Sequence, residues 1–191
     1  MSKLSLSREN WSMWWLNRLF YILCSALVLS ACGYQYSGLA PINLPEDSTK
    51  IFLNKVTDPT TETWIEPMLR SSIRDEFTRR GKVTWVGRDE AQATMNIVVH
   101  SYSTSDSLKG RHDVTLKSEA RIQLEVSIYN ALTHSLIWTS GTVVASESYR
   151  GSGGTRTSEG IIQETSAKRE ATRSAIDLAA RIVADRLSQK F

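Results

Sequence analysis

Residues 116–128 alternate between apolar and polar side chains almost without interruption. Successive side chains of a β-strand point to opposite faces, so this alternation predicts a strand with one buried and one solvated face. At about 3.3 Å per residue, a strand over residues 114–129 would extend roughly 50 Å, so we expect it to bend or to project beyond the core. The buried set is Leu116, Ala120, Ile122, Leu124, Val126 and Ile128, and the solvated set is Lys117, Glu119, Arg121, Gln123, Glu125 and Ser127.

Other strands are predicted from short β-branched and aromatic runs that are bounded by turn residues. A hairpin tip is expected at residues 106–113 and a turn at residues 130–134, and Gly141 is expected to mark a bulge. The additional strands are predicted over residues 50–56, 82–87, 94–105 and 135–149.

Two amphipathic helices are predicted on either side of these strands. The first starts between Thr63 and Pro67, with Thr63 and Glu66 as a capping box, and ends at Gly81. The second runs over residues 159–189, with apolar residues spaced by three and four positions. The apolar stripe of the first helix is Ile65, Leu69, Ile73 and Phe77, and that of the second is Ile162, Ala171, Ala175, Leu178, Ala179, Ile182 and Leu187.

This order of elements predicts the fold class. One helix follows the first strand and another follows the last strand, and the strands between them are joined by short turns. We therefore expect an α+β domain in which two helices pack on one face of a mostly antiparallel four- to five-stranded sheet.

The N-terminal segment has the organisation of a bacterial export signal. Residues 19–29 form an uncharged apolar run, too short to span a bilayer, and basic residues precede it. The run ends in Leu29-Ser30-Ala31-Cys32, which resembles a lipobox. We expect cleavage before Cys32, a diacylglyceryl group on its thiol and an N-acyl chain on its amino group. An ordinary secretory signal, or a buried helix that contains a cysteine, is the alternative.

The signal divides the chain into three parts. Residues 1–31 are predicted to be the signal peptide, 32–49 a lipidated N-terminal arm and 50–191 a single α+β domain. Gly33 follows the cysteine, which by resemblance to the enterobacterial sorting rule favours an outer-membrane, periplasm-facing, lipid-anchored protein. Translation could start at Met1 or at Met13.

Charge and cysteine content exclude several classes of function. Without its first 31 residues the chain keeps 20 basic and 19 acidic residues, a balance that argues against a nucleic-acid binder acting through bulk charge. Of the two cysteines, Cys24 lies in the signal and Cys32 is the lipidation site. The mature domain is therefore expected to contain neither a disulfide nor a catalytic thiolate.

No motif for catalysis or metal binding is recognisable. His100, His112 and His134 lack metal-ligand spacing, and His100 reads as an ordinary strand residue. The glycine-rich residues 151–155 are not followed by the Gly-Lys-Ser/Thr of a phosphate loop. We therefore predict no enzyme activity, no metal and no cofactor apart from the covalent lipid. A hydrolase would need a convergent carboxylate pair, or a nucleophile with a base, in a cleft.

Several short motifs in a fixed order resemble the LptE family of lipopolysaccharide-assembly lipoproteins. Proteins of that family fold as two helices against a four-stranded sheet and sit in the lumen of the β-barrel protein LptD. There they act as plug and assembly partner in lipopolysaccharide insertion, and they are not enzymes. The resemblance implies the same fold and partners here. The motifs are Cys32-Gly33-Tyr34 with Tyr36 and Gly38, residues 50–54 leading into Asp58-Pro59-Thr60, residues 64–69 and residues 75–81.

Lipopolysaccharide is polyanionic, so basic residues at the hairpin tip are candidates for contacting its phosphates. We name Lys109, Arg111 and His112 at the tip and Lys117 and Arg121 on the adjoining polar face. The alternative is that these are solubilising turn residues. A second class of function also stays open: a lipoprotein that regulates a cell-wall synthase or serves as a subunit of another secretion assembly.

Overall fold

The computed structural model describes Arg18, residues 41–42, residue 44 and residues 48–110, 115–151 and 158–190. The chain divides into two compact units, residues 1–36 and 37–191, and every element below belongs to the second. No helix within the described ranges combines the length and the apolar character needed to cross a bilayer. In chain order the elements are β1 (Lys50–Thr57), α2 (Ile65–Arg79), β2 (Thr84–Trp85), the 3₁₀ turn η3 (Arg88–Glu90), β3 (Ala93–Lys109), β4 (Thr115–Asn130), β5 (Leu136–Thr139), β6 (Val143–Arg150) and α3 (Ser158–Ser188).

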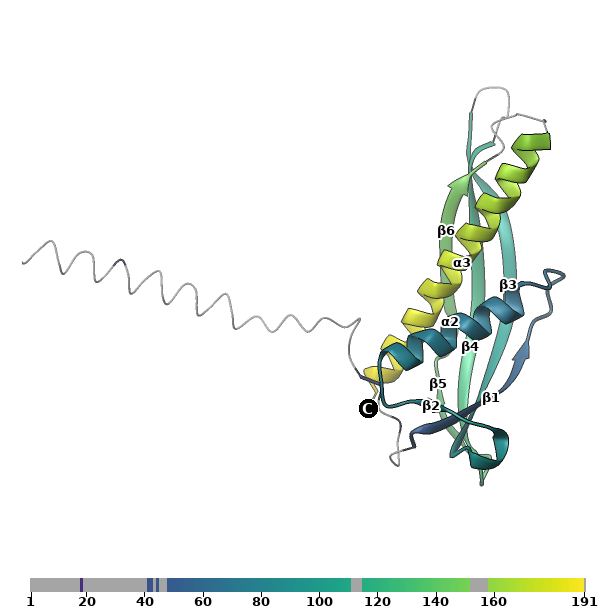
Figure 1. Cartoon of the computed structure of the whole chain (residues 1–191). Helices are drawn as coiled ribbons and strands as arrows, with labels where there is room; N and C mark the ends of the chain where they lie inside the picture. The colour runs from purple at the N-terminus through teal and green to yellow at the C-terminus, as the bar shows by residue number, and fades with distance from the viewer. Residues whose placement is uncertain are drawn as a thin grey trace, which may run out of the picture. The chain divides into compact units, whose positions relative to one another are not determined.

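The strands form one six-stranded sheet in the order β2-β1-β3-β4-β5, and β6 pairs with β4 beyond the end of β5. β1 is parallel to β2 and β3, whereas the pairs made by β4 are antiparallel. Both helices lie on the same face of the sheet, α3 along the strands and α2 across them (Figure 1). The predicted α+β architecture is confirmed.

The predicted strand over residues 135–149 is two strands, which accounts for part of the difference in strand number. Ser140 interrupts it: its backbone N–H donates to the Val126 carbonyl and its Oγ accepts from the Val126 N–H. Gly141 follows with φ of +59°, a conformation that favours glycine. Arg186 of α3 donates to the carbonyls of Ser140 and Thr142, at 2.6 and 2.9 Å. It thereby provides hydrogen-bond donors for the backbone carbonyls at the interruption.

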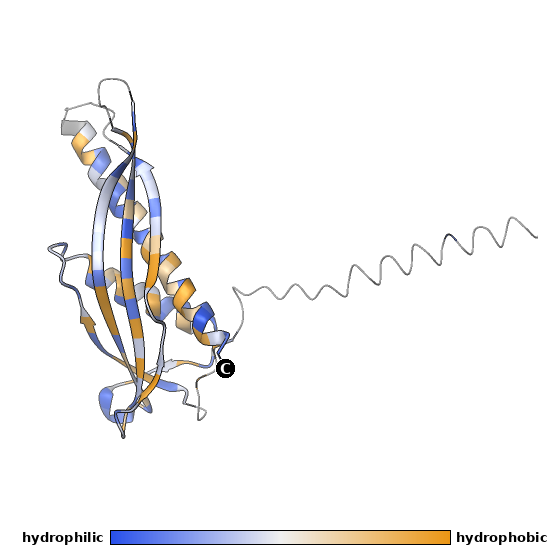
Figure 2. Ribbon diagram, turned by 180° about the vertical axis from the view of Figure 1, so that it is seen from behind, coloured by the Kyte–Doolittle hydropathy of each residue, from blue (hydrophilic) through white to orange (hydrophobic). Residues whose placement is uncertain are grey.

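The alternation in β4 buries its apolar face under the helices, as predicted. Every residue of that face from Ser118 to Ile128 is buried. Leu116 is the exception, with 46% of its surface exposed, because it lies near the hairpin end of the strand. Seen from behind, the apolar residues of the strands gather in the half of the sheet away from the hairpin, and the hairpin half is mostly hydrophilic (Figure 2).

Helix α2 buries the predicted stripe of Ile65 to Phe77, but its start differs from the prediction. The N-cap residue is Trp64, and no side chain caps the first turn, so the capping box of Thr63 and Glu66 is wrong. Glu62 takes part in the entry to the helix instead. Its carbonyl accepts from the Ile65 N–H, and its carboxylate accepts from Trp64 Nε1 at 2.8 Å.

A buried arginine joins the C-terminal ends of the two helices. Arg80 is 7% exposed, its Nε donates to Glu76 Oε1 at 2.7 Å, and its Nη2 donates to the Arg181 carbonyl of α3. Asp185 Oδ1 lies 2.7 Å from Arg80 Nη1, as an ion pair without hydrogen-bond geometry. Since an unpaired buried charge is costly, this cluster fixes where α2 ends on α3.

The arm that precedes β1 contributes to the core, which the sequence interpretation of residues 32–49 did not include. Ile42 is 1% exposed, Leu44 is buried as well, and both belong to the main hydrophobic cluster. The Gln92 side chain accepts from the backbone N–H groups of Thr49 and Lys50 and so holds the chain as it enters β1.

This packing predicts that Ile42→Ala lowers the free energy of unfolding by about 2–5 kcal/mol, the usual range for truncating a fully buried isoleucine. Leu136→Ala is the matched control, because Leu136 is 55% exposed, and it should change stability by less than about 0.5 kcal/mol. Denaturant unfolding of the domain measures both. Equal, small effects would show that residue 42 does not pack in the core.

Candidate functional site

The hairpin half of the sheet extends beyond the region that the helices cover. All side chains of β3 from Ser103 to Lys109 are exposed. β4 pairs with this part of β3 as far as Thr115, and β6 pairs with the other side of β4 as far as Arg150, which lies opposite Lys117. This half buries little apolar surface, so its sequence is free to serve a purpose other than folding.

Basic side chains gather on the face of this half that points away from the helices. Lys117 of β4 lies directly opposite Arg150 of β6, and Arg121 lies opposite Ser146. All three cations alternate with the buried residues of their strands and are exposed. Lys109 lies opposite Thr115, two residues before Lys117, at the end of the hairpin.

Electrostatic repulsion makes the directly opposite pair of Lys117 and Arg150 unfavourable unless an anion lies nearby. Directly opposite residues on neighbouring strands have Cβ atoms about 4.5–5.5 Å apart, where like charges repel. Glu119 is the carboxylate between Lys117 and Arg121 on this face. Within the described ranges, Lys109, Lys117, Arg121 and Arg150 form no ion pair, so their charge is available to an anionic ligand.

The structure brings together three of the residues named from sequence. Lys109, Lys117 and Arg121 lie in the hairpin half of the sheet. Arg111 and His112 lie outside the described residues, as does Cys32, so the roles expected of them stay predictions.

Sequence reasoning missed Arg150 as a member of this cluster. It closes the last strand, and only the register of β6 against β4 places it opposite Lys117. A basic residue directly after the predicted strand over residues 135–149 was the available signal, but it does not identify the neighbour across the strand pair.

A second cluster ties the segment before α2 to the middle of α3. Lys168 Nζ donates to Glu62 Oε1 at 2.8 Å, and Tyr102 of β3 lies 3.0 Å from Thr172 through their hydroxyl oxygens. The Trp64 ring contacts the Tyr102 ring edge-on at 6.1 Å between centroids. These contacts hold α3 against β3 where the covered half of the sheet ends.

The ion pair of this cluster shifts the pKa values of both partners. Hydrogen bonds from Lys168 and then from Trp64 lower the pKa of Glu62 below its usual 4.5. The hydrogen bond to Glu62 raises the pKa of Lys168 above its usual 10.5. Burial raises the pKa of Tyr102. None of these shifts brings a group near neutral pH, as a general acid or base would need.

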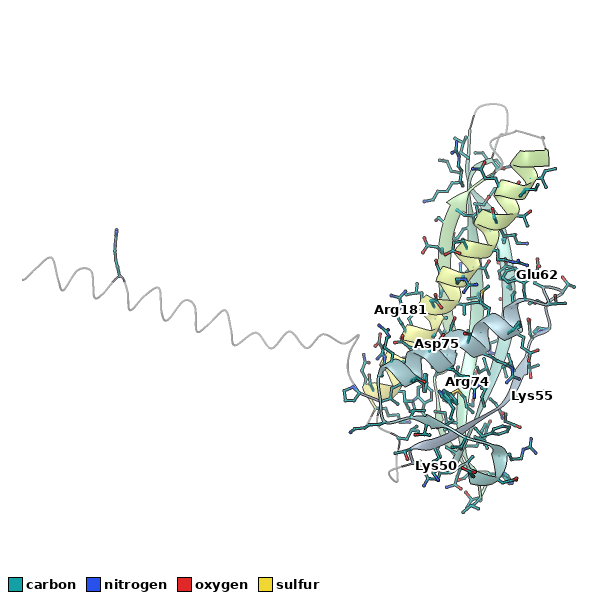
Figure 3. All side chains as sticks on the ribbon, in the orientation of Figure 1. Lys50, Lys55, Glu62, Arg74, Asp75 and Arg181 are labelled. Carbon is teal, nitrogen blue, oxygen red and sulfur yellow. The ribbon has the colours of Figure 1, made fainter. Side chains whose placement is uncertain are left out.

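An open polar groove runs between the two helices. It has a volume of about 490 Å³ and is lined by Trp64 and Met68 at one end and by Asp75 and Asp177 further along. Asp75 and Arg181 mark the place where α2 and α3 cross (Figure 3). Two serine hydroxyls of the groove donate to its carboxylates, Ser72 to Asp177 at 2.6 Å and Ser71 to Asp75 at 3.2 Å.

The histidines and carboxylates of the described chain do not assemble a metal site. No group of three or more histidine, cysteine, aspartate or glutamate side chains within those ranges could hold a metal ion. His100 Nε2 lies 3.5 Å from Glu125 Oε2 on the uncovered sheet face, as an ordinary strand residue with a neighbour. His134 lies in the turn after β4 with φ of +55°.

Comparison with known proteins identifies a family. The model of the LptE family, described as lipopolysaccharide-assembly, matches residues 48–187. No curated protein matches the chain.

Three solved structures are reported as similar to this chain. A protein of the DUF330 family from Xanthomonas campestris is 13% identical with a TM-score of 0.50, over 75% of this chain and 83% of that chain. A putative lipoprotein from Caulobacter crescentus is 14% identical with a TM-score of 0.49, over 81% of this chain and 92% of that chain. A minor lipoprotein from Acinetobacter baumannii is 17% identical with a TM-score of 0.46, over 75% and 92%. At these identities the Xanthomonas structure shows a similar fold only.

The Glu62–Lys168 pair predicts a pH-dependent contribution to stability. A lowered carboxylate pKa stabilises the fold above about pH 4.5 and loses its effect as pH falls through the lowered value. A raised lysine pKa stabilises the fold below about pH 10.5 and loses its effect as pH rises through the raised value.

A double-mutant cycle of Glu62→Gln and Lys168→Met should therefore give a coupling of about 0.2–1 kcal/mol at pH 7, because the pair is partly exposed. In unfolding experiments the coupling should shrink as the pH falls below about 4.5, towards the lowered pKa of Glu62. A control cycle of Glu62→Gln with Arg181→Gln, which Figure 3 places well apart, should give none. A pH-independent coupling would contradict the ion pair as its source.

Proposed function

Because this chain belongs to the LptE family of lipopolysaccharide-assembly proteins, we propose that it is an outer-membrane lipoprotein that plugs an LptD-like β-barrel. In this role it assists assembly of the barrel and helps to insert lipopolysaccharide into the outer leaflet. The family match over residues 48–187 is the observation that carries the proposal.

The lipobox supports attachment through Cys32. Each buried methylene contributes about 0.8 kcal/mol, so two or three acyl chains hold the protein on a membrane with little dissociation. The docking of Ile42 in the core leaves nine residues between the lipid site and the domain. The ten Cα–Cα steps from Cys32 to Ile42 span at most about 35 Å, so the domain stays near the leaflet that anchors it.

The cationic surface, which consists of Lys109, Lys117, Arg121 and Arg150, supports direct contact with lipopolysaccharide phosphates. Lys117 and Arg150 lie opposite each other on two strands, which suits the binding of one phosphate by both, and Arg121 offers a planar pair of donors four residues further along β4. Binding of an anion would also remove the repulsion between the opposite cations. The Glu119 carboxylate repels anions, so we expect a bound phosphate to lie on the hairpin side of Glu119.

The surface of the domain supports the plug role. The uncovered face of the sheet is polar along β4, and the balance of 20 basic and 19 acidic residues gives no strong net charge. Such a surface fits the wet, polar interior of a large β-barrel. The covalent tether would keep it beside a barrel in the same membrane.

A tagged capture from the native outer membrane tests the proposal. With a tag after Phe191, detergent extraction should recover one large β-barrel protein in stoichiometric amount, and depletion of the chain should reduce surface lipopolysaccharide. Cys32→Ser should lose membrane attachment and recover much less barrel. Recovery of a cell-wall synthase, or of a subunit of another secretion assembly, would replace this function with the alternative.

The cationic surface predicts a salt-sensitive affinity for lipopolysaccharide. Each charge-assisted hydrogen bond contributes about 1.5–3 kcal/mol, so Lys117→Gln and Arg150→Gln should each weaken binding about tenfold or more. Arg173→Gln on the exposed side of α3 is the control and should leave affinity unchanged. Binding of purified protein to immobilised lipopolysaccharide at two salt concentrations measures this, and equal affinities for all variants would exclude the surface as the site.

A further inference from the structure

One edge of β3 has no neighbouring strand along its hairpin half. β1 pairs with β3 only as far as Thr57 opposite Val98, and no other described strand takes its place. β3 continues for eleven more residues to Lys109 with β4 as its sole partner. No described strand therefore pairs with the backbone groups that point away from β4 over this length.

The regular part of this open edge is residues 101–106. One register shift lies between Val99 and Ser101 and the next between Asp106 and Leu108, and the six residues between them pair with β4 without interruption. Six residues of straight strand extend about 20 Å. We call this stretch the β3 edge.

The β3 edge lacks the features that protect exposed strands from pairing. Natural edges are blocked by lysine, proline, bulges or short length. Within residues 101–106 four of the six side chains are serine or threonine, and neither lysine nor proline occurs. The single charge, Asp106, is engaged within the hairpin by Thr115 Oγ1 at 2.9 Å and by Ser118.

The outer edge of β6 provides the contrast. It is also unpaired among the described strands, but its exposed end carries Glu147 and Arg150, and α3 packs along it. Charged side chains and the helix restrict the approach of another strand to β6. The β3 edge is therefore the accessible one.

We infer that the β3 edge binds an extended segment of a partner polypeptide, which adds a strand to the sheet by backbone hydrogen bonds. This deepens the proposed function and rests on it for the existence of a stable protein partner. Such strand addition draws its affinity from main-chain groups and its specificity from alternate side chains. The small hydroxyl groups of Ser101, Ser103 and Ser105 leave room for large side chains on the added strand.

Interface size favours a partner protein over a second copy of this chain. A stable dimer buries at least about 1,200 Å² in total, and one added strand of six residues buries far less. A partner that surrounds the domain makes further contacts elsewhere, so a short strand suffices as one part of its interface.

Photo-crosslinking in the native outer membrane tests the strand. A photoreactive residue replaces Ser103 or Ser105 on the β3 edge, or Ser146 or Ser148 on β6 as matched controls. Ser103 and Ser146 both lie opposite Arg121, and Ser105 and Ser148 both lie opposite Glu119. The two β3 variants should crosslink to one partner segment at positions two residues apart, and the β6 variants should not.

Charge substitution provides an independent test. Ser105→Lys should reduce recovery of the partner at least about fivefold, because a lysine blocks the edge, while Ser148→Lys should leave it unchanged. Either lysine faces Glu119, so both variants should keep the thermal stability of the parent.

The outcomes separate this inference from the proposed function. Three results would each contradict strand addition at the β3 edge. They are crosslinks without a two-residue register, crosslinks to a second copy of this chain, and full recovery of the partner with Ser105→Lys. If a barrel is still recovered in those cases, the plug function stands. If no stoichiometric barrel is recovered from the parent protein, the proposed function itself fails.

Discussion

Burial of one face of β4 is the constraint on which the rest of this domain depends. β4 pairs with β3 on one side and with β5 and β6 on the other, so its apolar residues lie at the centre of the sheet. Both helices must then pack on that single face to cover it. The position of the helices, the end of α2 at the buried Arg80 and the break between β5 and β6 all follow from closing this one layer.

Covering only part of a long sheet divides the domain into two regions with different tasks. The half under α2 and the second part of α3 holds the hydrophobic cluster and carries the stability. The hairpin half buries little and carries the exposed cations and the open edge of β3. A two- or three-stranded ribbon of this kind is only marginally stable by itself. It keeps its strand conformation because β4 continues into it from the core. The covered half therefore supports the surface that we propose for binding.

The candidate site shows where sequence reasoning reaches its limit. The alternation of β4 places Lys117 and Arg121 on the solvated face without any structure. Arg150 joins them only because β6 pairs with β4 in a particular register, and that register is set by the break at Ser140 and by Arg186 of α3. The packing of Ile42 and Leu44 was equally inaccessible, because the stretch between Pro41 and Pro45 is too short to show a periodicity that indicates burial.

The sequence by itself determined the order of the elements, the faces of β4 and of α2, and the family, because these depend on local periodicity and on short motifs. Tertiary structure decided what depends on contacts between distant segments. It split residues 135–149 into two strands, replaced the capping box by a contact from Glu62, and left the β3 edge without a neighbour. In each case the deciding energy comes from partners far apart in the chain, which no local pattern records.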